Sequence, residues 1–278
     1  MSFQTLPSGG NKGERPWWLF AFLALAALAA ISIVLNGMYT QVFGVVAKGI
    51  WVTVFVTLVA FALATLLGLL IAVLGLSSHI ALRQTARFYI EIVRGIPILV
   101  LLFYVAFVGA PSLVALANYI LSPLIDAGAM SKIMVRDFSL MWRAIIALTI
   151  GYAAFIAEIF RAGIQSVDEG QIEAAKALGL GRFQRFRLII FPQAIRTIFP
   201  PLSNDFVSMV KDSSLVSVLG VADITQMGKV YAASSFRFFE TYSIVAYIYL
   251  LLTIGLSLML RSVERRMRRK NGYERRSG

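Results

Sequence analysis

The feature that most constrains this chain is a series of apolar runs, each close to the roughly twenty residues that a helix needs to cross a bilayer. Such runs begin at Trp17, Gly44, Ile96, Met141 and Tyr242. They are continuous and do not alternate polar with apolar residues, so helices rather than barrel strands are expected to span the membrane. The composition agrees, because 59% of the residues are hydrophobic and only 14% are charged. The sequence predicts an all-α integral membrane protein.

The first run, residues 17–35, has the alternative interpretation of a secretory signal peptide, because Lys12 and Arg15 precede it. Its nineteen residues exceed the apolar core of a signal peptide, which has about 7–15 residues. No clear A-x-A cleavage site follows the run. We therefore predict a retained transmembrane helix over residues 17–36, preceded by a cytoplasmic tail of residues 1–16.

Five further spans are predicted, which makes six in total. The third span of the chain starts at Ile96-Pro97, and Gly109-Ala110-Pro111 is expected to interrupt it. Residues 118–140 are mixed and charged, which indicates a loop with a short interfacial helix. The five spans cover residues 44–74, 96–108, 141–160, 200–221 and 242–260.

A ridge of small residues lies in the second span, where Ala60, Ala64, Gly68 and Ala72 recur every fourth residue. Such a ridge allows another helix to approach closely. In so alanine-rich a run, composition alone also produces this spacing.

The basic residues indicate the orientation of the spans. The segments 1–16, 77–95, 161–196 and 261–278 contain 19 of the 26 Lys and Arg residues. Because cytoplasmic loops carry the excess of basic residues, both termini are predicted to be cytoplasmic in a bacterial inner membrane. The basic tail 265–278 fits this topology. The net charge of +12 is thereby explained without nucleic acid as a partner, and contact with membrane lipid is expected.

The chain has no cysteine and a single histidine, His79, so a thiolate or zinc site is not expected. We predict no metal and no cofactor. A nucleotide site is not expected either. The only Gly-Lys pair, Gly228-Lys229, is followed by Val230 instead of the Ser or Thr of a phosphate-binding loop.

The longest predicted cytoplasmic segment, residues 161–196, has the pattern of a capped helix. Ser166 with Glu169 and Asp168 with Gln171 form two overlapping capping boxes. Gly179 then suits the left-handed position that ends a helix. The sequence predicts a short helix standing in the cytoplasm between two spans, followed by an amphipathic helix that returns to the membrane.

This segment resembles the EAA loop of ABC importer permeases, which reads E-A-A, three residues, G, nine residues, I-x-L-P. Phe191 is the one departure, where the pattern has leucine. Six motif positions in register argue against a generic helical hairpin. In the family this loop forms the coupling helix that docks in a groove of the ATPase subunit. The residues that carry the resemblance are Glu173, Ala174, Ala175, Gly179, Ile189 and Pro192.

Three other stretches are similar to the polar amino acid branch of that family, which takes up histidine, glutamine, arginine or glutamate. They are Arg94-Gly95-Ile96-Pro97, Ala157-Glu158-Ile159-Phe160-Arg161-Ala162-Gly163 and Lys211-Asp212-Ser213-Ser214-Leu215. The resemblance covers residues 44–264, and it implies a type I ABC importer permease fold. The helix at 17–36 is additional to the five-helix core common in that branch, and the loop 118–140 is enlarged.

The resemblance implies a transport subunit and not an enzyme: a permease that moves a polar amino acid while a separate ATPase hydrolyses ATP. It also implies a second permease subunit, identical or homologous, and a periplasmic or extracellular amino-acid-binding protein.

Ionisable residues inside spans are costly, so they are candidates for the substrate path. Glu158 either faces the path or forms an ion pair with Arg161 at the cytoplasmic boundary. The fifth span is too polar to face lipid, and Pro200 and Pro201 predict a broken helix of the kind that builds substrate sites. The alternative is a helix buried against a second subunit, with Lys211 and Asp212 paired. The candidates are Glu158, Asp205, Ser208, Lys211, Asp212 and Ser213.

Two other functions compete with this reading. An ion-coupled secondary amino acid transporter would use Asp205 or Glu158 as an ion site, but the chain lacks a second, inverted half. A membrane-embedded enzyme would need a nucleophile with a base or a metal cluster, and no such constellation stands out.

Overall fold

The computed structural model describes residues 17–274, with side chains placed for residues 17–267. The predicted N-terminal tail, residues 1–16, lies outside this range, as does the end of the predicted basic tail. The elements are α1 (Trp17–Leu35), α2 (Gly37–Val46), η1 (Ala47–Gly49), α3 (Ile50–Gly75), α4 (Ile80–Gly95), α5 (Ile98–Tyr104), η2 (Val105–Gly109), α6 (Ala110–Ile120), α7 (Ser122–Asp126), η3 (Val135–Asp137), α8 (Leu140–Gln165), α9 (Glu169–Ala177), α10 (Arg182–Arg185), η4 (Phe186–Ile190), α11 (Phe191–Asp212), η5 (Ser213–Leu219), α12 (Ile224–Ser235) and α13 (Phe238–Glu274).

Five helical segments in the described part of the chain are long and apolar enough to cross a membrane. They overlap the predicted spans, although the second extends further toward the N-terminus and the third continues beyond residue 108 to Ile120. The predicted span at residues 200–221 corresponds to α11 and η5, whose polar residues leave it out of this group, so the number of six spans stays a prediction. The five segments are Trp17–Leu35, Gly37–Gly75, Ile98–Ile120, Leu140–Gln165 and Phe238–Met267.

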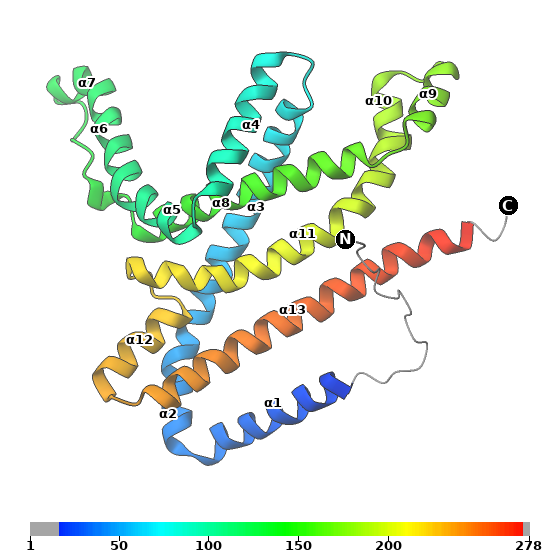
Figure 1. Ribbon diagram of the computed structural model, residues 1–278. Coiled ribbons are helices and arrows are strands. Elements are labelled where there is room, and N and C mark those ends of the chain that lie inside the picture. Colours follow the sequence, from blue (N-terminus) through cyan, green and yellow to red (C-terminus); the bar gives the residue numbers. More distant parts are fainter. Residues whose placement is uncertain (1–16, 275–278) are drawn as a thin grey trace, which may run out of the picture.

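The helices form a splayed arrangement rather than a closed bundle (Figure 1). Helices α8, α11 and α13 lie side by side in that order, while α3 crosses behind them and packs on α8. Residues 161–196, the predicted coupling loop, contain α9 and α10; we call them the coupling segment. This segment projects at one end of the molecule, on the same side as the end of α13. Helices α7 and α12 lie at the opposite end. The long helices therefore connect the two ends.

The small-residue ridge of α3 forms its contact with α8. Ala60, Ala64 and Ala72 are buried, and α3 and α8 share the most extensive contact between helices. A Cβ atom on Gly68 would lie 2.9 Å from Cγ2 of Ile156, which is too close for a side chain. The small residues at this spacing therefore form a packing surface, and their spacing is not an effect of composition alone.

The predicted interruption of the third span at Gly109-Ala110-Pro111 is wrong, because the helix continues from α5 through η2 into α6. The turn η2 is π-helical, and Pro111 follows it in the first turn of α6. A π-helical turn widens the backbone, so a proline that lacks an N–H is accommodated at this point without ending the helix. The helix starts at Ile98, and Pro97 is its N-cap.

The predicted break at Pro200 and Pro201 is also wrong, because both prolines lie inside the continuous helix α11. Each proline removes one backbone hydrogen bond, but its fixed φ is compatible with a helix, and packing on a neighbouring helix holds the segment together. That packing is close, since a Cβ atom on Gly163 of α8 would lie 2.2 Å from Cγ1 of Ile198. The helical pattern changes later, at Ser213, where α11 tightens into the 3-10 helix η5.

Two segments taken as cytoplasmic or external loops contain helix. Residues 80–95 form the amphipathic helix α4, which packs on α3 and α8. In the loop 118–140 the short helix is present as α7, and Asn118 closes the loop: its Nδ2 donates to the carbonyl of Ile133 at 2.8 Å, while the N–H of Ile133 donates to its Oδ1 at 2.9 Å.

Candidate functional site

The coupling segment begins with a side-chain cap. Asp168 is the N-cap of α9, and its Oδ1 accepts a hydrogen bond from the backbone N–H of Gln171 at 3.1 Å. Of the two overlapping capping boxes, the helix therefore starts at the second. The Ser166 hydroxyl donates instead to the carbonyl of Gly163 at 2.8 Å, and it lies 3.2 Å from the hydroxyl of Thr197. These contacts tie the end of α8 to α11 below the cap.

Gly179 ends α9 as predicted. Its φ is +77°, in the left-handed region. The N–H of Gly179 donates to the carbonyl of Lys176 at 3.0 Å, and the N–H of Leu180 donates to that of Ala175 at 3.1 Å. This pair of bonds is the Schellman motif, which requires a residue with positive φ at the position of Gly179.

The EAA residues differ in exposure around the short helix. Ala175 is buried, whereas Glu173 and Ala174 face outward. The Nε2 of Gln193 donates to Oε1 of Gln171 at 2.7 Å, which holds α9 against the start of α11. Ile189 and Pro192, the last motif residues, are half-buried on this returning helix.

Large apolar side chains are exposed next to these residues. Leu178 is 81% exposed and Phe183 72% exposed. Exposed apolar side chains that gather on a projecting loop mark a surface for another protein or for the membrane. In Figure 1 the segment stands clear of the other helices, so this surface is accessible.

The polar residues of α11 point in two directions. Asn204, Ser208 and Lys211 line a cavity of about 540 Å³ between α11 and α13. From α13, Ser257 and Arg261 contribute to its wall. Asn204, Ser208 and Lys211 thus share one face of α11, which opens onto a polar space.

The two carboxylates of α11 lie on the side of α8. The hydroxyl of Tyr152 donates to Oδ2 of Asp212 at 2.7 Å. Oδ2 of Asp205 is buried and has no hydrogen-bond partner among the described residues. Ser213 is buried too, and its hydroxyl donates to the carbonyl of Val210 at 2.7 Å. In the described residues no ion pair joins Lys211 to Asp212, so the predicted pairing is wrong. The alternative that this helix is buried against a second subunit stays a prediction.

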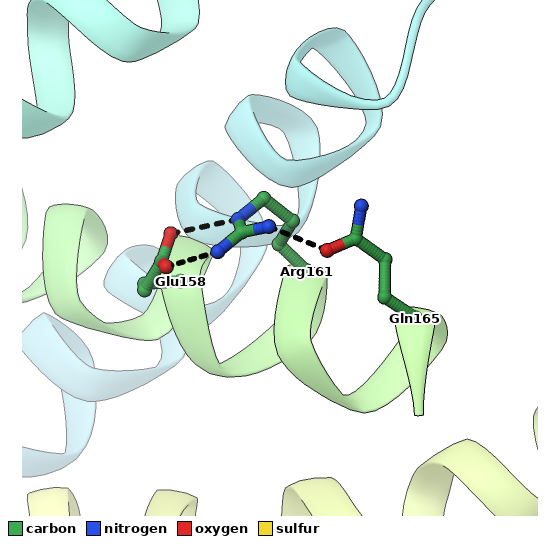
Figure 2. Close-up of polar contacts among 3 residues, drawn as sticks. All are labelled: Glu158, Arg161 and Gln165. Atoms are coloured by element: carbon green, nitrogen blue, oxygen red, sulfur yellow. Dashed lines mark hydrogen bonds and ion pairs between the residues drawn. The ribbon is translucent and has the colours of Figure 1, made fainter. Parts of the chain in front are cut away.

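Glu158 lies apart from these residues. Figure 2 shows its carboxylate accepting two hydrogen bonds from the guanidinium of Arg161, which also donates to Gln165. The pair borders a second cavity, of about 450 Å³, between α8 and α4. Arg83 and Arg87 of α4 border the same space. The predicted ion pair is confirmed, and the structure does not bring Glu158 to the cavity between α11 and α13.

Tyr152 is the residue of this region that sequence reasoning missed. A tyrosine inside a buried span needs a partner for its hydroxyl, and the carboxylate of Asp212 provides one. The signal was present as a phenolic hydroxyl in a largely apolar run, but the sequence does not show which helix packs against it.

Comparison with known proteins decides the family. Residues 64–269 match the family described as the inner membrane component of binding-protein-dependent transport systems. The chain belongs to this family. It is 38% identical over 216 residues to the probable amino-acid permease protein YxeN of Bacillus subtilis, covering 78% of this chain and 88% of that protein.

Further relatives agree with this membership. The glutamine transport system permease protein GlnP of Escherichia coli K12 is 33% identical over 221 residues, covering 80% of this chain and 92% of GlnP. A crystal structure of an amino acid ABC transporter with histidines matches at a TM-score of 0.67 and 36% identity, covering 85% of this chain and 97% of that one. The protein is therefore an ABC importer permease, a membrane transport subunit, and such permeases work with an ATPase and a substrate-binding protein.

Proposed function

We propose that this permease imports a polar amino acid across the bacterial inner membrane, with energy from a separate ATPase subunit. The observation that carries the proposal is the capped helix α9, which is held against the start of α11 and ends at Gly179. Support for the substrate comes from the relatives, which are named as amino-acid and glutamine permeases, and from the structural match titled as an amino acid ABC transporter.

The proposed coupling surface consists of Glu173, Ala174 and the exposed apolar side chains beside them. Docked in a groove of the ATPase, α9 would move with that subunit, and α8 and α11 on either side of it would transmit the motion to the path. Closure and opening of the ATPase with nucleotide would then shift the permease between two conformations.

A second permease subunit, identical or homologous, completes the pathway in this proposal. The substrate path runs along α11, where Lys211 offers a cation beside the cavity. Asp205 offers a carboxylate with an unpartnered oxygen on the side of α8, so the two groups do not line the same cavity. Ser208 contributes on the side of the cavity, whereas Asp212 and Ser213 are engaged with Tyr152 and Val210.

We propose the domain boundaries given by the sequence: an additional helix at 17–36, a type I permease domain at 44–264 with its coupling loop at 161–196, and a basic cytoplasmic tail at 265–278.

An ion-coupled secondary transporter remains the second candidate function. The unpartnered carboxylate oxygen of Asp205 favours it, since a buried carboxylate of this kind also suits a proton or sodium ion.

We expect six spans with both termini in the cytoplasm, because the basic residues concentrate in the segments on that side. Reporter fusions after Arg15, Met130 and Arg269 measure this. The fusion after Met130 should be active in the periplasm, and the two terminal fusions in the cytoplasm. Periplasmic activity at either end of the chain would contradict the topology.

The substrate class is tested by purifying the permease with its co-expressed neighbours and screening the binding protein for ligands. The proposal expects a polar amino acid to bind that protein and to stimulate ATP hydrolysis by the complex. A ligand of another chemical class would contradict it.

A further inference from the structure

Arg143 is a buried cation near the start of α8. Its side chain belongs to a residue that is only 6% exposed. It is the fourth residue of a helix that begins at Leu140, and the N-terminal end of a helix disfavours a positive charge. Burying a cation at such a position is costly unless acceptors surround it.

The acceptors are three backbone carbonyls from two separate segments. Nε of Arg143 donates to the carbonyl of Phe138 at 2.8 Å, and one terminal nitrogen donates to that of Val135. The other terminal nitrogen donates to the carbonyl of Ala106 at 3.1 Å. The guanidinium also lies over the ring of Phe138, 5.9 Å from its centroid. Only the planar fork of arginine serves acceptors in this arrangement.

The carbonyl of Ala106 needs this donor because of the π-helical turn. In an α-helix it would accept from the N–H of Ala110, but that N–H donates to Val105 instead. The next residue is Pro111, which has no N–H. Ala106 is fully buried, so water does not replace the missing donor. Arg143 thus donates to the carbonyl of Ala106 the hydrogen bond that the helix containing Ala106 does not provide.

The segment between these contacts, residues 110–137, is called here the outer hairpin. Asn118 and Ile133 close it through their two reciprocal hydrogen bonds. Arg143 joins both of its ends to α8, since Val135 lies at one end and Ala106 lies just before the other. The far end of α8 leads directly into the coupling segment (Figure 1).

We propose that Arg143 is a positioning residue for transport, which fixes the outer hairpin to α8 so that the external end of the permease and the coupling segment respond together. The proposal rests on the ABC importer function given above. It assigns to Arg143 no contact with the substrate.

The contact itself is tested by a double-mutant cycle in the assembled complex. Arg143→Met should lower the unfolding temperature by on the order of 5 °C, because buried carbonyls lose their donor. Pro111→Ala introduces an N–H five residues after Ala106, the spacing of a π-helical bond. In the double variant this N–H should restore at least half of the loss. Strictly additive losses would overturn the assignment of Arg143 to the carbonyl of Ala106.

The functional role is tested by ATP hydrolysis with and without the loaded binding protein. Arg143→Met should reduce the stimulated rate about tenfold and leave the basal rate within about twofold, a difference of roughly one decade in rate. Arg143→Lys keeps the charge but not the planar fork of the guanidinium. Its stimulated rate of ATP hydrolysis should therefore lie between those of the wild type and Arg143→Met. Equal loss of the basal and stimulated rates, or unchanged stimulation, would overturn the positioning role.

Two outcomes are kept separate by this design. If the wild-type complex shows no stimulated hydrolysis, the proposed function fails, while the unfolding cycle still decides the Arg143 contact. If Arg143→Met does not assemble, Arg143→Lys with and without Pro111→Ala provides the same comparison.

Discussion

Replacing Gly179 with valine is expected to reduce uptake about tenfold or more, while the amount of permease in the membrane stays unchanged. Gly179 has a φ of +77°, and a side chain in the left-handed region costs roughly 1–2 kcal/mol, more when it is β-branched. A Cβ atom there meets nothing within 4 Å, so the effect is conformational and not steric. Strain at this position would turn α9 away from its docking groove.

Two variants serve as controls for this prediction. Gly179→Asn should retain most of the uptake, because asparagine tolerates positive φ. Gly181→Val changes a nearby glycine whose φ is −64°, which other residues adopt readily, so it should have a much smaller effect. Normal transport and normal substrate-stimulated ATP hydrolysis in Gly179→Val would show that the coupling assignment is wrong.

Removing one charge from the proposed path should affect charged and neutral amino acids unequally. A buried carboxylate contributes far more to binding a cationic side chain than a neutral one. We therefore expect Asp205→Asn to reduce uptake of cationic amino acids more than that of neutral ones. Lys211→Met should show the opposite preference, with acidic or neutral substrates more affected. The measurement is uptake by the reconstituted complex for a panel of amino acids.

Glu158→Gln belongs in the same panel because the sequence allowed two roles for Glu158, on the path or paired with Arg161, and the structure contains the pair. If the pair is structural, this variant should change the uptake of all substrates alike. The change should be slight, since the two side chains are 36% and 37% exposed. Expression and assembly with the ATPase are measured beside uptake. Uniform loss with failed assembly in Asp205→Asn and Lys211→Met would favour an interface role, and unchanged transport in both would remove them from the path.

Most of the fold could be predicted because a bilayer imposes long apolar helices, which the sequence displays directly. The first span, predicted at residues 17–36, corresponds to α1, which ends at Leu35. The errors concern prolines. Whether Pro111 or Pro200 ends a helix depends on what packs beside it and on a local π-helical turn, and neither is visible in a linear pattern.

The candidate site was only partly predictable for the same reason. The cap at Asp168 and the turn at Gly179 depend on residues close in sequence, so spacing alone located them. The partners of Asp212 and Arg143 are distant in sequence: Tyr152 lies 60 residues from Asp212, and Ala106 lies 37 residues from Arg143. These contacts depend on helix packing that one sequence does not encode in any local signal.

The central claim is that ATP hydrolysis by a partner subunit drives transport through this chain. The most direct measurement is uptake of the binding protein's ligand into proteoliposomes that contain the purified complex, with either ATP or an imposed proton or sodium gradient as the energy source. The account predicts uptake that requires ATP, the ATPase and the binding protein, and that does not respond to the gradients alone. Uptake by the permease with an ion gradient and without ATP would contradict it and establish the secondary transporter instead.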